Sequence, residues 1–248
     1  MKKAFTLAEG ATHVAHWNNF RKTAFTLAEV LITLGIIGVV AAMTMPTLMA
    51  NYRKSVVEKK IYTTYNILQN ALGMSVVDNG DPMYWSEGNN LDNDFFEKYF
   101  VPYLKVINSC HSTEDEDCST TMKNINGTST FKYNRKYILS NGTGIMYNAG
   151  DVGQRKGSIV IDTMMGKERV IGKNAFTLNF IVTDSKYYIT SKTDYTEDFC
   201  NVNKTNKSTL ISLCKSASSG QGFTLGIACT ALIECNGWQL PKEYPVKF

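Results

Sequence analysis

The chain has 248 residues, of which 44% are hydrophobic and 19% charged, and it carries a formal net charge of +4 at neutral pH. This length is enough for one membrane helix and one globular domain. Four basic residues and one acid precede Phe25, so the remainder is close to neutral. Because proteins bind nucleic-acid phosphates through concentrated positive charge, nucleic acid is not expected as a partner.

A six-residue string, Ala-Phe-Thr-Leu-Ala-Glu, occurs twice near the N-terminus, once ending at Glu9 and once ending at Glu29. Only the second copy leads into an apolar run, because residues 30–52 contain no charged side chain. As a helix, this run is long enough to cross a membrane core of about 30 Å. The residues after the first copy are polar and small, which favours the interpretation that this copy is a partial duplication or part of an extended leader. The alternative is that the first copy competes with the second as a processing site.

Glu29 stands at the start of this apolar run. An ionisable side chain in a spanning helix costs about 2.5–3.5 kcal/mol at the bilayer centre and less near its edge, and it usually marks a specific partner. The basic pair Arg21-Lys22 precedes the run. It predicts that this end of the chain stays in the cytoplasm and that the residues after the run are exported.

Residues 22–32 are Lys-Thr-Ala-Phe-Thr-Leu-Ala-Glu-Val-Leu-Ile, and Gly38 and Pro46 lie downstream. Over about residues 21–55 this pattern resembles the N-terminus of a type IV prepilin or pseudopilin. The resemblance implies that a membrane aspartyl peptidase cuts between Ala24 and Phe25 and methylates the new amine of Phe25. Glu29 would then be the fifth residue of the mature chain. Most members have glycine before the cut, where this chain has Ala24.

The new amine offers Glu29 a partner, because an α-amine has a pKa of about 8 and is mostly cationic at neutral pH. If subunits stack with parallel helices, the amine of Phe25 in one subunit can meet Glu29 of its neighbour and offset the cost of desolvation. Such a pair would set the register between subunits. Gly35, Gly38 and Pro46 predict a deformable helix; the alternative is that Gly and Pro are simply commoner in spanning helices.

The helical pattern continues beyond the apolar run. Apolar residues recur every three or four positions from Val57 to Val76 among charged ones, which predicts an amphipathic helix to about Val77 that packs on the sheet of its own domain. Residues 78–82, Asp-Asn-Gly-Asp-Pro, should end it. The expected organisation is a removed leader (1–24), a transmembrane and filament-core helix (25–52), its amphipathic continuation (53–80) and an exported head (81–248).

The head has the signals of an α+β fold. We expect a short helix near 91–104 with aromatic core residues, a hairpin of 137–140 and 144–147 around Asn141-Gly142, and strands at 158–162, 176–183 and 186–190. A helix is also expected at 225–234, whereas the polar stretch 201–222 would need crosslinks to be held. A long N-terminal helix on an antiparallel sheet, with a disulfide-stitched C-terminal region, is the pilin-like arrangement.

The six cysteines all follow the apolar run, where export would place them in an oxidising compartment. Disulfides are favoured over zinc because no C-x-x-C pair occurs and His111 is the only histidine after the run. Cys110 and Cys118 flank a short acidic loop and are expected to pair locally. The family resemblance implies a C-terminal loop closed by a disulfide that joins one of an upstream pair to one of a downstream pair: Cys200 or Cys214 to Cys229 or Cys235.

No catalytic, metal or cofactor site is expected. The acidic run 114–117 could hold calcium, but a solvated acidic turn is favoured. Asp162 could hold a cation in a loop, but an ordinary turn is favoured there. The sequence offers no Ser/His/Asp arrangement around His111, no G-x-S-x-G and no phosphate-binding loop.

The expected function is that of a structural subunit, a pilin, minor pilin or pseudopilin, of a type IV pilus or type II secretion-like filament. The implied partners are other pilin subunits, the prepilin peptidase/methyltransferase, the inner-membrane assembly platform with its ATPase, and membrane lipid before assembly. The protein would cross the inner membrane once and later enter a cell-surface or periplasmic filament. The alternatives are a membrane-anchored binding protein or adhesin that does not polymerise and, less favoured, an exported hydrolase.

Overall fold

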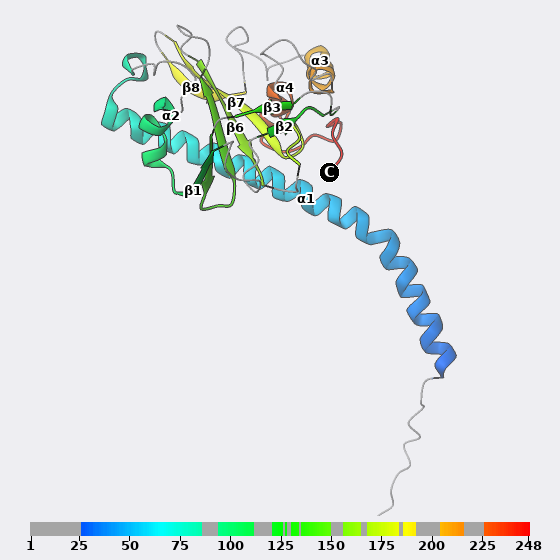
Figure 1. The fold of residues 1–248 in the computed structure, drawn as a ribbon. Coiled ribbons are helices and arrows are strands. Elements are labelled where there is room, and N and C mark those ends of the chain that lie inside the picture. The colour runs from blue at the N-terminus through cyan, green and yellow to red at the C-terminus, as the bar shows by residue number, and fades with distance from the viewer. Residues whose placement is uncertain are drawn as a thin grey trace, which may run out of the picture. The chain divides into compact units, whose positions relative to one another are not determined.

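Helix α1 (Leu27–Asn79) is the first element that the structure describes and is 53 residues long. In this computed structural model the helices and strands of a head follow it (Figure 1). The chain divides into two compact units, residues 1–47 and residues 48–248, and the second contains the later part of α1 with the whole head. The structure describes residues 26–85, 94–111, 121–125, 127, 130–133, 135–149, 156–164, 168–183, 186–191, 204–215 and 226–248.

The later part of α1 packs on the head through one face. Val57, Ile61, Leu68 and Leu72 are each no more than 2% exposed and belong to the main hydrophobic core with residues of the sheet. Their spacing of three or four residues is the reason that they share a face. The predicted amphipathic helix on its own domain's sheet is therefore confirmed.

Helix α1 ends next to a glycine that adopts a left-handed backbone conformation. Gly80 has φ +75°, and its N–H donates to the carbonyl of Val76 at 3.0 Å, as in a left-handed helix C-cap. Asp81 then accepts a hydrogen bond from the N–H of Met83 at 2.8 Å and begins the 3₁₀ turn η1 (Pro82–Tyr84). The predicted stop at residues 78–82 is confirmed.

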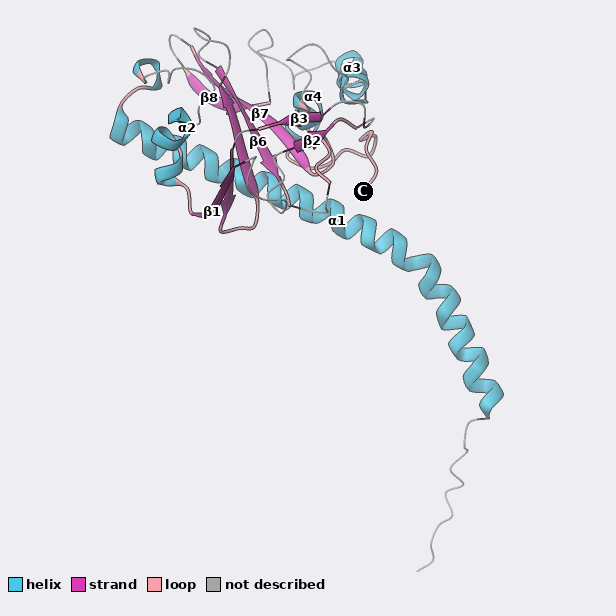
Figure 2. Ribbon diagram, viewed as in Figure 1, coloured by secondary structure: helices cyan, strands magenta, loops and turns pink. Residues whose placement is uncertain are grey.

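A six-stranded sheet forms the centre of the head (Figure 2). Its order is β1-β4-β5-β6-β7-β8, every neighbouring pair is antiparallel, and β2 and β3 form a separate antiparallel pair. The strands are β1 (Val106–His111), β2 (Thr121–Lys123), β3 (Thr130–Lys132), β4 (Arg135–Leu139), β5 (Gly144–Ala149), β6 (Lys156–Asp162), β7 (Ala175–Val182) and β8 (Tyr187–Thr190).

The β4–β5 hairpin is the one that the sequence predicts. Its loop has three residues, because the N–H of Leu139 donates to the carbonyl of Thr143 at 2.8 Å. Gly142 closes the turn with φ +72° and donates to the carbonyl of Leu139 at 2.9 Å, which is the geometry of a three-residue loop with glycine in the left-handed region. Asn141 supports the turn by accepting from the N–H of Thr143 at 3.1 Å.

Both faces of the sheet are covered. Successive side chains of a strand point to opposite faces, so Ile145 and Tyr147 of β5 join the core that contains α1, whereas Met146 joins a second cluster with Met122 of β2 and Val160 of β6. Because the side chains alternate between the two faces, the sheet has one apolar cluster on each face. Helix α1 closes one of them and the β2–β3 pair contributes to the other.

The remaining helices are short. The predicted aromatic helix is represented by α2 (Asp94–Tyr99) and the 3₁₀ turn η2 (Val101–Tyr103). The aromatic core around it is confirmed, since Phe96, Tyr99 and Phe100 are buried and the Tyr99 ring stacks on Trp85 with centroids 4.3 Å apart. Helix α4 (Ile227–Cys235) matches the helix expected at 225–234.

Four elements were not predicted: β1, β2, β3 and α3 (Lys204–Lys215). Helix α3 lies in the polar stretch expected to be held only by crosslinks. It is nevertheless helical, and it buries Leu210 and Cys214 against α4 in a third hydrophobic cluster. This packing, together with the disulfide between Cys214 and Cys229 of α4, therefore stabilises a helix in a segment whose composition favours a loop.

Candidate functional site

The N-terminus of α1 contains a reciprocal cap between Thr26 and Glu29. The N–H and Oγ1 of Thr26 both donate to Oε2 of Glu29, at 2.8 and 2.9 Å, and the N–H of Glu29 donates to Oγ1 of Thr26 at 3.2 Å. This is a capping box, in which two orphan donors of a helix end are satisfied by side chains. Within a single chain, Glu29 therefore helps to cap the N-terminus of its own helix.

The first half of α1 exposes its apolar side chains. Leu31, Ile36 and Met43 are among the large hydrophobic residues whose side chains are mostly exposed. The helix is long and apolar enough to cross a membrane by length and composition. An apolar surface of this extent requires lipid or protein around it, because soluble monomers rarely expose large contiguous apolar patches.

Helix α1 continues without interruption through the three residues expected to make it deformable. A Cβ added to Gly35 or Gly38 would have no atom within 4 Å, so neither glycine is required by a close approach within this chain. Pro46 lies inside the helix and supplies no N–H to its hydrogen-bond ladder. The proposed flexibility at these positions stays a prediction.

A polar seam joins α1 to the β4–β5 hairpin inside the head. Nζ of Lys60 donates to the carbonyls of Gly142 at 3.0 Å and Thr163 at 2.8 Å. The hydroxyls of Thr64 and Thr143 lie 3.0 Å apart, and both residues are fully buried. Burial lowers the pKa of Lys60, and the nearby Asp162 carboxylate opposes that shift. The seam fixes the hairpin on the helix.

Asp162 lies in a buried ion cluster rather than in a free loop. Its Oδ2 accepts from Nζ of Lys136 at 2.5 Å and from Nε of Arg169 at 3.0 Å. Its Oδ1 accepts from the N–H of Met164 at 2.8 Å. Two protein cations and a backbone donor therefore already pair with this carboxylate, so the geometry gives no support for a bound cation at Asp162. Burial lowers the pKa of Lys136, and the Asp162 carboxylate acts in the opposite direction.

One disulfide of the C-terminal region is fully described. Cys214 of α3 and Cys229 of α4 are joined, with Cα atoms 4.8 Å apart. Cys110 takes part in a disulfide, and so does Cys235. Cys118 and Cys200 lie outside the described residues, so the local Cys110–Cys118 pairing stays a prediction. The disulfide-stitched C-terminal region is confirmed.

Several other predicted positions also lie outside the described residues. They include the cut between Ala24 and Phe25 and the acidic run 114–117. His111 is the last residue of β1. Among the described residues, no group of three or more His, Cys, Asp or Glu side chains could hold a metal ion.

Two features of the site escaped sequence reasoning. The capping box was visible as the signature Thr-Leu-Ala-Glu at residues 26–29, which is the S/T-x-x-E pattern before an apolar run. The ion cluster had no such signal. Lys136, Asp162 and Arg169 are separated along the chain; the sheet register brings Lys136 of β4 near Asp162 of β6, and Arg169 comes from the segment between β6 and β7.

The comparison with protein families agrees with this geometry. Residues 19–45 match the model of the prokaryotic N-terminal methylation motif, which is the type IV prepilin signature. With its long apolar helix on an antiparallel sheet, the chain is thus a pilin-like protein. It belongs to a family of unknown function (DUF6613), whose model matches residues 47–248. No curated protein and no solved structure matches the chain.

Proposed function

We propose that the protein is a non-catalytic structural subunit, a pilin, minor pilin or pseudopilin, of a type IV pilus or type II secretion-like filament. The observation that carries the proposal is the exposed apolar half of α1, most of which lies within the prepilin signature at residues 19–45. Such a helix is stable in lipid before assembly and in a bundle of neighbouring helices afterwards. The signature also implies processing by a prepilin peptidase and assembly with other pilin subunits.

We further propose that Glu29 pairs with the Phe25 amine of a neighbouring subunit. In the single chain the Glu29 carboxylate accepts two hydrogen bonds from Thr26. A carboxylate has about four acceptor positions, so it can hold its own cap and still accept from an amine. The pair would fix the axial register of one helix against the next in a low-dielectric core.

Two substitutions separate the cap from the charge. Glu29→Gln keeps the capping box, which accepts Gln as well as Glu, but it removes the negative charge. Thr26→Ser keeps the cap and the charge and is the matched control. We expect Glu29→Gln protein to remain in the membrane while its amount in the sheared filament fraction falls at least about tenfold, the effect of roughly 1.4 kcal/mol.

The measurement is the amount of subunit in sheared and membrane fractions of the native host, with intact mass as a check on processing. An N-terminus at Phe25 with one methyl group supports the proposal. A normal filament yield from Glu29→Gln protein would rule out the charge-pair register. Wild-type protein that stays in the membrane fraction under conditions of filament assembly would favour an anchored binding protein or adhesin instead.

A further inference from the structure

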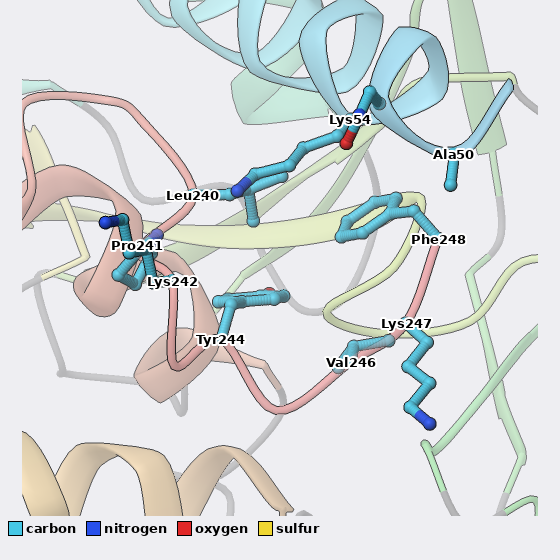
Figure 3. A pocket seen from close by; sticks show the side chains of 10 residues that line it. Ala50, Lys54, Leu240, Pro241, Lys242, Tyr244, Val246, Lys247 and Phe248 are labelled. Atoms are coloured by element: carbon cyan, nitrogen blue, oxygen red, sulfur yellow. The ribbon is translucent and has the colours of Figure 1, made fainter. Parts of the chain in front are cut away.

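A pocket of about 320 Å³ lies between α1 and the segment that follows α4 (Figure 3). One wall is the turn of α1 that carries Ala50, Asn51 and Lys54, and the other is formed by residues 240–248. Figure 3 shows the rings of Tyr244 and Phe248 beside each other in the pocket. The volume falls in the range of small-molecule sites.

The wall opposite α1 is held by two partly buried hydrogen bonds. The hydroxyl of Tyr244 donates to the carbonyl of Gly172 at 2.6 Å, and the N–H of Leu240 donates to Oε1 of Glu58 at 2.8 Å. The Tyr244 and Phe248 rings also contact each other, with centroids 6.1 Å apart. These contacts attach the segment both to the head and to α1, so the pocket is a feature of the packed head.

The lining combines positive charge with apolar surface. Of the ten described residues that line the pocket, three are lysines and none carries an acidic side chain. The nearest acids in sequence have other partners: Glu243 accepts from Lys207 at 3.0 Å, and Glu58 accepts from the backbone of Leu240. An anion with an adjoining apolar part therefore matches this lining.

The pocket also has a fixed place along α1. Ala50 and Asn51 belong to the last turn of the uncharged run that ends at Tyr52, and Lys54 follows two residues later. With a rise of 1.5 Å per residue, Lys54 is about 3 Å along the helix axis from the end of that run. Phospholipid headgroups occupy this level when the run spans a bilayer.

We propose that this pocket binds the phosphate-bearing headgroup of an anionic phospholipid from the membrane that α1 spans. Lys54 and Lys242 would contact the phosphate, and Tyr244 and Phe248 would contact the glycerol and upper acyl carbons. Binding would hold the head at the membrane surface before assembly. The proposal depends only on membrane anchoring, so it stands or falls separately from the filament proposal.

The test uses full-length protein in detergent micelles and measures bound lipid by native mass spectrometry. The probes are phosphatidylglycerol and, as the zwitterionic comparison, phosphatidylcholine. The double variant Lys54→Gln, Lys242→Gln should weaken phosphatidylglycerol binding about 30-fold, since each lysine near an anionic surface contributes about 1 kcal/mol. The control is Lys59→Gln, Lys105→Gln, which removes two exposed lysines outside the pocket lining.

The expected result is a preference for phosphatidylglycerol that the pocket variant loses and the control variant keeps. Equal binding of the two lipids by wild-type protein, or equal loss in both variants, would overturn the proposal. Competition by millimolar inorganic phosphate would also overturn it, because the site would then take the free anion without the lipid. Near-ultraviolet circular dichroism of each variant establishes that the head is folded.

Discussion

Lys136 and Asp162 form an ion pair across an intervening strand, with 2.5 Å between Nζ and Oδ2 and at most 1% of either side chain exposed. Lys136 lies on β4 and Asp162 on β6, and β5 separates them. Gly144 of β5 is paired directly with Asp162. A Cβ at Gly144 would collide with Cε of Lys136, so the missing side chain leaves room for the lysine to reach the carboxylate.

Gly144→Ala should therefore destabilise the head. The added methyl group must displace Lys136, and overpacking of this kind costs about 1–3 kcal/mol. Thermal unfolding of the full chain in detergent, followed by near-ultraviolet circular dichroism, measures the effect. Gly73→Ala is the matched control, because a Cβ at this exposed helical position meets nothing within 4 Å. The control should gain up to about 1 kcal/mol, and an equal loss in both variants would contradict the steric argument.

Removing the carboxylate of Asp162 should cost more than removing the amine of Lys136. Asp162→Ala leaves Lys136 and Arg169 buried without their counter-ion, a loss of about 3–5 kcal/mol. Lys136→Met leaves Asp162 paired with Arg169 and replaces the lysine stem with apolar volume, so it should cost clearly less. Urea unfolding of both variants measures the difference. Equal losses would show that Arg169 does not stabilise the remaining carboxylate.

The elements that the sequence predicts well are those with a local signal. The apolar residues from Val57 to Val76 recur with the helical period, and the dipeptide Asn141-Gly142 is by itself a signal for the hairpin turn. The edge strand β1 has no such signal, because its formation depends on pairing with β4, whose residues lie more than twenty positions later. Long-range pairing of this kind is invisible to periodicity.

The same distinction applies to the candidate site. Glu29 is recognisable because its partners and the apolar run are adjacent in sequence. The pocket that contains Lys54 combines one turn of α1 with residues almost 200 positions later. No local pattern in the segment 240–248 indicates that it packs beside the end of the apolar run. The membrane helix was therefore predictable and the pocket was not.

The buried hydroxyl pair between Thr64 and Thr143 yields a third prediction. Thr64→Val keeps the shape of the side chain but leaves Thr143 and Asn141 each without a partner that Thr64 now provides. Loss of a partner for a buried polar group costs about 1–3 kcal/mol. The neighbouring Thr63 is exposed, and Thr63→Val should change stability by no more than about 0.5 kcal/mol. Urea unfolding of the two variants compares them directly, and a neutral Thr64→Val would show that the seam does not stabilise the docking of the hairpin.

The Cys214–Cys229 disulfide should hold α3 on the head. It closes a loop with a sequence separation of 15, for which the chain-entropy model gives about 3 kcal/mol. In the Cys214→Ser, Cys229→Ser variant, limited proteolysis should cut within 204–215 before any other described helix. The control is Lys207→Gln, which removes an exposed ion pair worth at most about 1 kcal/mol. Protection of α3 in the double variant would show that the hydrophobic contacts of Leu210 suffice.

Two buried tyrosines should make the head less stable at high pH. Burial raises the pKa of Tyr133 and of Tyr137 to about 12. The unfolded chain releases these phenolic protons near pH 10, whereas the folded chain retains them until about pH 12. The folded state therefore holds more protons in this window, and stability that is fully present below about pH 10 is lost as the pH rises.

Tyr133→Phe is the variant that tests this dependence. From about pH 10 to about pH 11, each tyrosine should remove roughly 1 kcal/mol from the free energy of unfolding, because a full proton difference is worth about 1.4 kcal/mol per pH unit and the unfolded phenol is only half ionised at about pH 10. Phenylalanine at position 133 has no proton to release. The free energy of unfolding of the variant should therefore fall less steeply with pH than that of the wild-type protein, by the contribution of one tyrosine. Tyr84→Phe is the control, since the Tyr84 side chain is 82% exposed and meets solvent in both states. If urea unfolding gives the same pH slope for Tyr133→Phe as for wild-type protein, the alkaline loss of stability arises from groups other than this buried phenol.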